Sequence, residues 1–199
     1  MTNFFKKLKE EFIKIINCNK LFLVFLLIAF CLGLIIAIIN LVSLKSVIIF
    51  NNLADVCLLR YLEKEISLFS FFLQRFFAYL LLFCFVILLC FNKFTSFLIC
   101  FLTLYLTYLF VFDMGVVIIC FGFFGIIFAI VNILIFNLCY LCLIFSLSLF
   151  CKSCYGRNYF NNLCCQYQFI LILLLVLTAL CLLEMILLPL LSSTFIIVI

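Results

Sequence analysis

The sequence predicts an all-α polytopic membrane protein, a single bundle of about five transmembrane helices. Of its 199 residues, 72% are hydrophobic and only 10% are charged, whereas soluble domains carry roughly half apolar and about a quarter charged residues. Several apolar runs reach the length of about 18 residues that a helix needs to cross a hydrocarbon core. These runs are apolar on every face, which excludes the alternating strands of a transmembrane β-barrel. The remaining structure that can span a bilayer is the α-helix, which satisfies its own backbone hydrogen bonds.

Residues 1–20 predict an amphipathic helix that lies on the cytoplasmic membrane surface. Apolar side chains recur there at helical spacing, with lysines and glutamates between them, as is typical of interfacial helices. Because all the lysines of this segment precede the first apolar run, the positive-inside rule puts the N-terminus in the cytoplasm. That run is too long for a cleaved signal sequence, and no small-residue cleavage site follows it, so we expect it to stay as an anchor.

Residues 21–191 are expected to form one helical domain. Its loops are an outer loop at 44–70 and an inner loop at 152–168, and a short outer tail at 192–199 follows it. Arg75, near the start of the second span, is expected to extend its guanidinium to the interface. The predicted spans are 21–42, 71–91, 94–120, 123–150 and 169–191.

The stretch 94–151 divides in two ways, because Asp113 is its only charged residue. One break around Gly122 to Gly125 gives two long helices and five spans in all, whereas breaks at Asp113 and near Asn137 give six spans. Five spans put all the later cations in the cytoplasm, and six would put two of them outside. These cations are Lys93, Lys152 and Arg157. The positive-inside rule therefore favours five spans.

Several function classes are poorly supported by the composition. The net charge of +5 does not indicate nucleic-acid binding, because the basic residues lie beside membrane segments. The chain has no histidine, the usual general base near neutral pH. It also lacks the short motifs of serine hydrolases, zinc proteases and phosphate loops. We therefore expect no catalytic residues and no cofactor, with the lipid bilayer as the first partner.

The 14 cysteines do not predict a disulfide scaffold. Most lie inside apolar runs, where cysteine behaves as a small hydrophobe. Cys151, Cys154, Cys164 and Cys165 could together supply four thiolates to a zinc ion. The second pair is adjacent in sequence, whereas structural zinc sites separate their ligands by two or more residues. We expect no bound metal.

Glu184 is the leading polar candidate, because it lies deep within an apolar run. A charge at such depth costs about 2.5–3.5 kcal/mol on insertion scales, so an intramembrane acid is a functional hypothesis. One interpretation is a carboxyl that bonds to a neighbouring helix, with Asn132 and Asn137 as candidate partners. The other is ion or proton transport. Asp113 raises the same question near the outer end of its helix.

The outer loop carries a candidate docking surface for a partner. Its apolar side chains share one face of a predicted helix, while Arg60 and Lys64 point toward water. The apolar face consists of Leu53, Val56, Leu59 and Leu62.

The segment MGVVIICFGFFGIIFAIVNILIFNLCYL, from Met114 on, resembles the central segment of the stage II sporulation protein M family. The late Glu184, followed five residues on by Pro189, is similar as well. The chain departs from the family pattern at Ile135, where the family has proline. The matching positions are Gly115, Gly122, Gly125, Phe128, Ala129, Asn137, Leu138 and Tyr140. The glycines would serve close helix contact or chain reversal.

The resemblance implies a non-enzymatic scaffold in the bacterial cytoplasmic membrane that acts in endospore formation. Proteins of that family anchor or recruit extracytoplasmic peptidoglycan-degrading partners at the septum during engulfment, and the outer loop would then be the docking surface. The alternative is a transport protein, either the membrane subunit of an ABC-type exporter or a small carrier that uses Glu184 and Asp113. An inverted repeat would favour transport, and we find no convincing one in this sequence.

Overall fold

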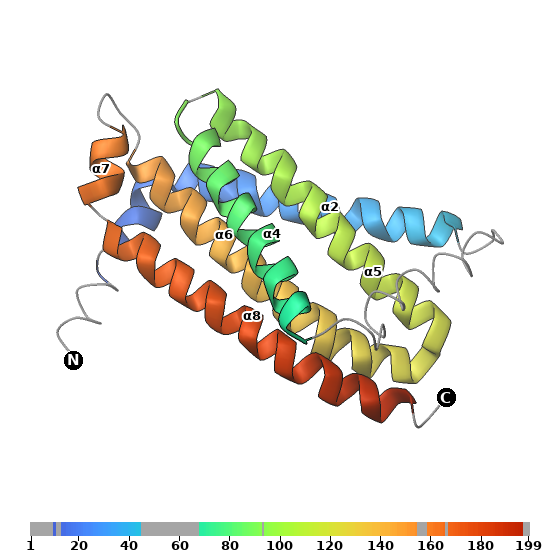
Figure 1. Ribbon diagram of the computed structural model, residues 1–199. Helices are drawn as coiled ribbons and strands as arrows, with labels where there is room; N and C mark the ends of the chain where they lie inside the picture. The colour runs from blue at the N-terminus through green and yellow to red at the C-terminus, as the bar shows by residue number, and fades with distance from the viewer. Residues whose placement is uncertain are drawn as a thin grey trace.

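The computed structural model describes residues 10, 13–44, 68–92, 94–154, 159–165 and 167–196. Within these ranges the chain is almost entirely helical and contains no strand. Long helices lie side by side in one bundle (Figure 1), and five of them are long and apolar enough to cross a membrane. The predicted all-α bundle of about five spans is confirmed. The candidate spans are Lys20–Ser43, Phe69–Leu89, Thr95–Ile119, Gly125–Ser153 and Tyr167–Leu187.

The helices follow one another with short connections through most of the described chain. The first two long helices are α2 (Lys20–Leu44) and α4 (Leu68–Leu89). A short 3-10 turn, η1 (Thr95–Phe97), leads into α5 (Leu98–Phe128). A π-helical segment, η2 (Ala129–Leu134), then joins α5 to α6 (Ile135–Ser153). The last two helices are α7 (Tyr159–Cys165) and α8 (Tyr167–Ile196).

The chain reverses direction once between the third and fourth spans, at Gly122. Its φ of 56° and ψ of −127° lie in a region that only glycine adopts without strain. Gly122 lies within the range of α5, and Figure 1 shows the resulting corner, after which the chain continues through η2 into α6. Asp113 lies inside α5 and Asn137 inside α6, so neither breaks a helix. The single-break division is therefore the one found, and the six-span alternative is wrong.

Two connections differ from expectation. The inner loop contains the short helix α7, and α8 begins at Tyr167 within the same predicted loop. At the other end, α8 continues past Pro189 to Ile196, so much of the expected tail is helical.

Residues 13–18 are helical too. The Leu23 N–H donates to the Asn19 carbonyl at 3.0 Å, so the helical hydrogen bonding continues into α2.

Small residues bring α2 and α5 into close contact. Ala29, Gly33 and Ala37 are spaced four apart on one face of α2, and all are buried. A Cβ on Gly33 would lie 2.7 Å from the carbonyl oxygen of Leu104 on α5. Small residues four apart allow such backbone approach, which is how membrane helices gain van der Waals contact. We did not predict this contact, although its spacing is visible in the sequence.

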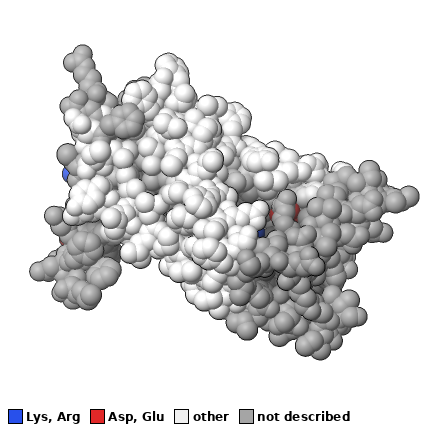
Figure 2. Space-filling model, in the orientation of Figure 1, with Lys and Arg blue, Asp and Glu red and all other residues white. Residues whose placement is uncertain are grey.

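The rest of the core joins α2, α4, α6 and α8. Leu26, Val86, Leu147 and Leu177 are fully buried in one cluster contributed by these helices. By contrast, many large apolar side chains point outward, and Figure 2 shows few charged side chains on the described surface of one face. Such a surface suits hydrocarbon rather than water.

Candidate functional site: a buried polar cluster around Glu184

Glu184 lies on α8 and is 3% exposed. The Tyr140 hydroxyl, on α6, donates a hydrogen bond of 2.7 Å to its Oε2 atom. Arg75, on α4, places its Nη2 atom 3.6 Å from Oε1 of the same carboxylate. One side chain therefore connects three helices that are far apart in sequence.

Two further side chains complete what we call the Glu184 cluster, which consists of Arg75, Tyr79, Tyr140, Cys181 and Glu184. Tyr79 lies one turn after Arg75 on α4, and its ring stacks on that of Tyr140 with centroids 3.8 Å apart and planes at 16°. Cys181 lies one turn before Glu184 on α8, and its Sγ atom is 3.5 Å from the Tyr140 hydroxyl oxygen. The stacked ring fixes the direction in which the Tyr140 hydroxyl points.

Arg75 reaches inward, although we expected it at the membrane interface. Its side chain is 27% exposed, and its guanidinium lies 5.5 Å from the ring centroid of Phe71, one turn earlier on α4. A guanidinium in this position gains from the aromatic face as well as from the carboxylate. Arg75 is thus the edge of the cluster, and Glu184 is its buried centre.

The contacts of Glu184 offset the free-energy cost of burying its carboxylate. An unpaired carboxylate in the bundle would be strongly unfavourable, whereas pairing with a cation and a hydrogen-bond donor offsets the desolvation. The geometry thus matches the interpretation of Glu184 as a group that bonds to neighbouring helices. Its partners differ from the expected ones: the Asn137 amide donates to the Ile133 carbonyl, one turn earlier in η2, at 2.8 Å. The side chain of Asn132 lies outside the described residues.

The remaining predicted residues occupy several places. Gly115 packs against Leu41 of α2, Gly125 is buried after the reversal, and Asp113 is partly buried on α5. Pro189 falls in α8, but the position of its side chain is not described. The proposed docking residues lie outside the described residues; they are Leu53, Val56, Leu59, Arg60, Leu62 and Lys64.

Sequence reasoning singled out Glu184 but not the residues around it. The family pattern points to Tyr140 but not to the role of its hydroxyl, and no sequence pattern points to Tyr79. A usable signal existed, because Arg75 and Glu184 are opposite charges inside two different spans. Ionisable residues within membrane spans commonly pair with one another.

A second set of polar contacts lies at the opposite end of the bundle. Lys152 donates to the Ser96 hydroxyl at 2.6 Å and lies 5.3 Å from the ring centroid of Phe22. The Tyr159 hydroxyl, on α7, donates to the Ile87 carbonyl at 2.8 Å. Burial raises the pKa of the Tyr159 phenol above its ordinary value of 10.0. These contacts hold α7 against α4, and the end of α6 against η1 and α2.

Among the described residues, no group of three cysteine, aspartate or glutamate side chains is arranged to hold a metal ion. Cys151 and Cys154 are buried and Cys164 is exposed, while the side chain of Cys165 is not described. Burial raises the pKa of the Cys154 thiol, which disfavours the thiolate that zinc requires.

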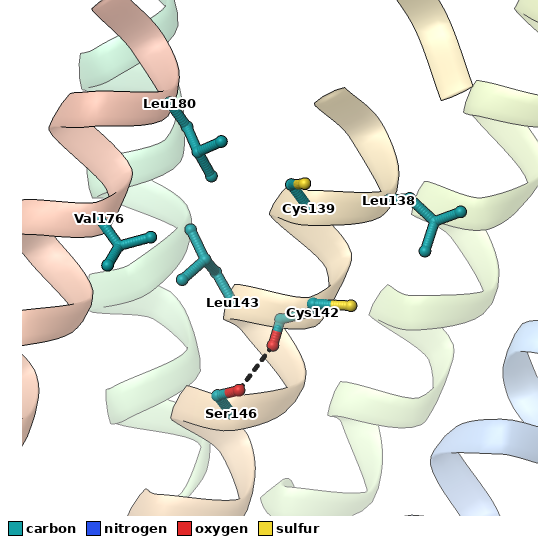
Figure 3. A pocket seen from close by; sticks show the side chains of 7 residues that line it. All are labelled: Leu138, Cys139, Cys142, Leu143, Ser146, Val176 and Leu180. Atoms are coloured by element: carbon teal, nitrogen blue, oxygen red, sulfur yellow. Dashed lines mark hydrogen bonds between the residues drawn. The ribbon is translucent and has the colours of Figure 1, made fainter. Parts of the chain in front are cut away.

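A shallow apolar groove of ≈ 310 Å³ lies between α6 and α8. Ser146 donates its hydroxyl proton to the Cys142 carbonyl at 2.8 Å, so this polar group is satisfied within its own helix (Figure 3). The other lining residues are Leu138, Cys139, Leu143, Val176 and Leu180. The groove offers no charged group to a polar solute.

Comparisons with protein-family models, with curated proteins and with solved structures find no match to this chain. The resemblance to the stage II sporulation protein M family thus stays a prediction from the sequence.

Proposed function

We propose that this chain is a non-enzymatic integral membrane scaffold. The observation that carries the proposal is the engagement of Glu184 on both carboxylate oxygens, by Arg75 and by Tyr140. A transport acid must exchange its partner for a proton or a solute during the cycle, whereas a structural acid keeps its partners. The contacts of Glu184 suit the second role, because they join α4, α6 and α8 into one unit.

The surface supports the same role. Side chains such as Leu21, Leu81 and Phe94 are 72–83% exposed and present hydrocarbon to the surroundings. Such side chains suit the hydrocarbon of a bilayer. In our proposal the N-terminus is cytoplasmic, the membrane is the bacterial cytoplasmic membrane, and the outer loop meets the partner.

The partner class comes from the sequence resemblance. We propose that the outer loop anchors or recruits peptidoglycan-degrading enzymes at the septum during engulfment in sporulation. The apolar face of Leu53, Val56, Leu59 and Leu62 would supply contact area, and Arg60 and Lys64 would supply charge. Rim charges of this kind change the association rate and the choice of partner.

The test is capture of partners from membranes of sporulating cells that carry the tagged protein. The variant Arg60→Glu/Lys64→Glu is expected to bring down less cell-wall hydrolase while inserting at the wild-type level. The control is Arg157→Glu, the same type of reversal in the inner loop, which should leave capture unchanged. If capture is equal in all three proteins, the outer loop is not the docking surface. Capture of an ATPase in place of a hydrolase would support the exporter and overturn the scaffold.

A further inference from the structure

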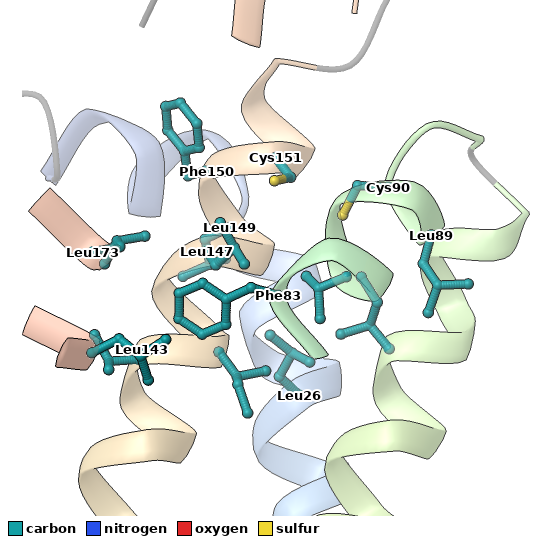
Figure 4. Packing of buried hydrophobic residues seen from close by; sticks show 14 of the residues in the cluster. Leu26, Phe83, Leu89, Cys90, Leu143, Leu147, Leu149, Phe150, Cys151 and Leu173 are labelled. Carbon is teal, nitrogen blue, oxygen red and sulfur yellow. The ribbon is translucent and has the colours of Figure 1, made fainter. Parts of the chain in front are cut away.

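Two buried thiols on different helices face each other at the end of the bundle near η1. Cys90 directly follows α4, and Cys151 lies in the last turn of α6. Both are 0% exposed, and neither forms a disulfide in this structure. Figure 4 shows them across the same space between the two helices.

The Cys90 thiol lies against the last turns of α6. The Cys90 Sγ atom lies 3.9 Å from the Ser148 carbonyl oxygen, which is one turn before Cys151 on α6. The carbonyls of an α-helix point toward its C-terminus, so this contact places Cys90 beside the last turn of α6. The side chains of Cys90 and Cys151 interact, and Figure 4 shows both sulfur atoms in the space between the two helices.

The surroundings favour this pair over other pairings. Cys90 lies in a turn at the end of α4, and its N–H donates to the Val86 carbonyl at 3.1 Å. The backbone can therefore shift slightly at Cys90 to form a disulfide without bending the middle of a helix. Cys154 is one turn beyond Cys151 and is also buried. Its side chain interacts with that of its neighbour Ser153, whereas the Cys151 thiol contacts both the Cys90 thiol and the Tyr159 hydroxyl.

We propose that Cys90 and Cys151 form an oxidisable dithiol, which a peroxide converts to a disulfide that ties α4 to α6. One thiol attacks hydrogen peroxide and becomes a sulfenic acid, releasing one water. The second thiol then displaces hydroxide from that sulfur and gives up its proton, releasing a second water. Two thiols and one peroxide thus yield one disulfide and two waters, and the peroxide carries away both electrons.

Burial determines which oxidant acts and how fast. Buried cysteines react slowly, and a small uncharged oxidant has the best access to them. In a reducing compartment the pair stays in the dithiol form. The disulfide is therefore expected under sustained peroxide exposure and is reversed by a dithiol reductant. The disulfide would hold α4 and α6 together at this end of the bundle.

Tryptic digestion separates the relevant cysteines. Cleavage after Arg75, Lys93 and Lys152 leaves Cys90 in peptide 76–93 and Cys151 in peptide 94–152. The second peptide also contains Cys100, Cys120, Cys139 and Cys142, so the Cys151→Ser variant is needed to identify the linked residue. Cys154 falls in the following peptide, 153–157, so a link to it gives a different mass. Peptide 76–93 also contains Cys84, which is exposed on α4, and Cys84→Ser is therefore the matched control.

The experiment treats membranes containing the full chain with hydrogen peroxide, blocks remaining thiols with an alkylating agent under denaturing conditions, and identifies linked peptides by mass spectrometry. We expect the 76–93/94–152 link in the wild type and in Cys84→Ser, with loss to background in Cys90→Ser and in Cys151→Ser. Persistence of the link in either of the last two variants would overturn the assignment. So would complete alkylation of Cys90 and Cys151 in membranes where the exposed cysteines have been oxidised.

Discussion

Removing the cation of the Arg75–Glu184 pair tests whether the cluster stabilises the bundle. In Arg75→Leu the Glu184 carboxylate keeps the Tyr140 hydroxyl but loses its counter-charge. Breaking a fully buried pair from one side costs about 3–5 kcal/mol. Here the closest atoms are 3.6 Å apart and Arg75 is 27% exposed, so the pair is longer and less buried than a fully buried ion pair, and we expect a loss of about 1–3 kcal/mol. Arg75→Lys, which keeps the charge, should lose less.

The double variant Arg75→Leu/Glu184→Leu makes the measurement specific. Unfolding would be followed in mixed micelles by raising the fraction of a denaturing detergent, for the wild type, both single variants and the double variant. Because the double variant buries no unpaired charge, its cost should be smaller than the sum of the single costs by about 1 kcal/mol or more. Additivity within about 0.3–0.5 kcal/mol would refute the idea that the pair stabilises the bundle.

Two further predictions concern packing and pH. A Cβ at position 33 would lie only 2.7 Å from the Leu104 carbonyl oxygen. We therefore expect Gly33→Leu to separate α2 from α5 and to lower the midpoint of unfolding. The control is Ile35→Leu, on the exposed face of α2, which should leave the midpoint unchanged. Because the folded pKa of Tyr159 is raised above 10.0, its protonated form stabilises the fold below that pH, and this stability is lost as pH rises further. Thermal unfolding as a function of pH should therefore decline more steeply above pH 10 in the wild type than in Tyr159→Phe, and equal slopes would contradict this.

Run length limited the chain to five or six spans, because it acts locally, and Gly122 to Gly125 offered one place for the chain to reverse. Apolar runs must lie in the bilayer whatever their neighbours, and Gly122 supplies a backbone conformation that other residues avoid. The choice of five spans over six depended on where the cations fall, and the helices continue through Asp113 and Asn137 as that choice requires.

Which helices meet, and through which residues, was harder to predict. Helices that are apolar all round carry no stripe that identifies a buried face, so neither α4 nor α8 reveals its partner. The contact between Arg75 and Glu184 joins residues more than a hundred positions apart, and only their opposite charges hint at it. The spacing of Ala29, Gly33 and Ala37 was readable in the sequence, but it identifies a close contact without naming the partner helix.

The role of Glu184 is tested most directly by Glu184→Gln, which keeps an acceptor for the Tyr140 hydroxyl and removes the charge that Arg75 faces. The measurement is hydrolase capture per folded chain from sporulating membranes, with the unfolding midpoint taken on the same preparation. If Glu184 holds helices together in a scaffold, the midpoint falls and capture per folded chain stays at the wild-type level. Loss of capture with an unchanged midpoint would contradict that role, because the carboxylate would then act directly in function.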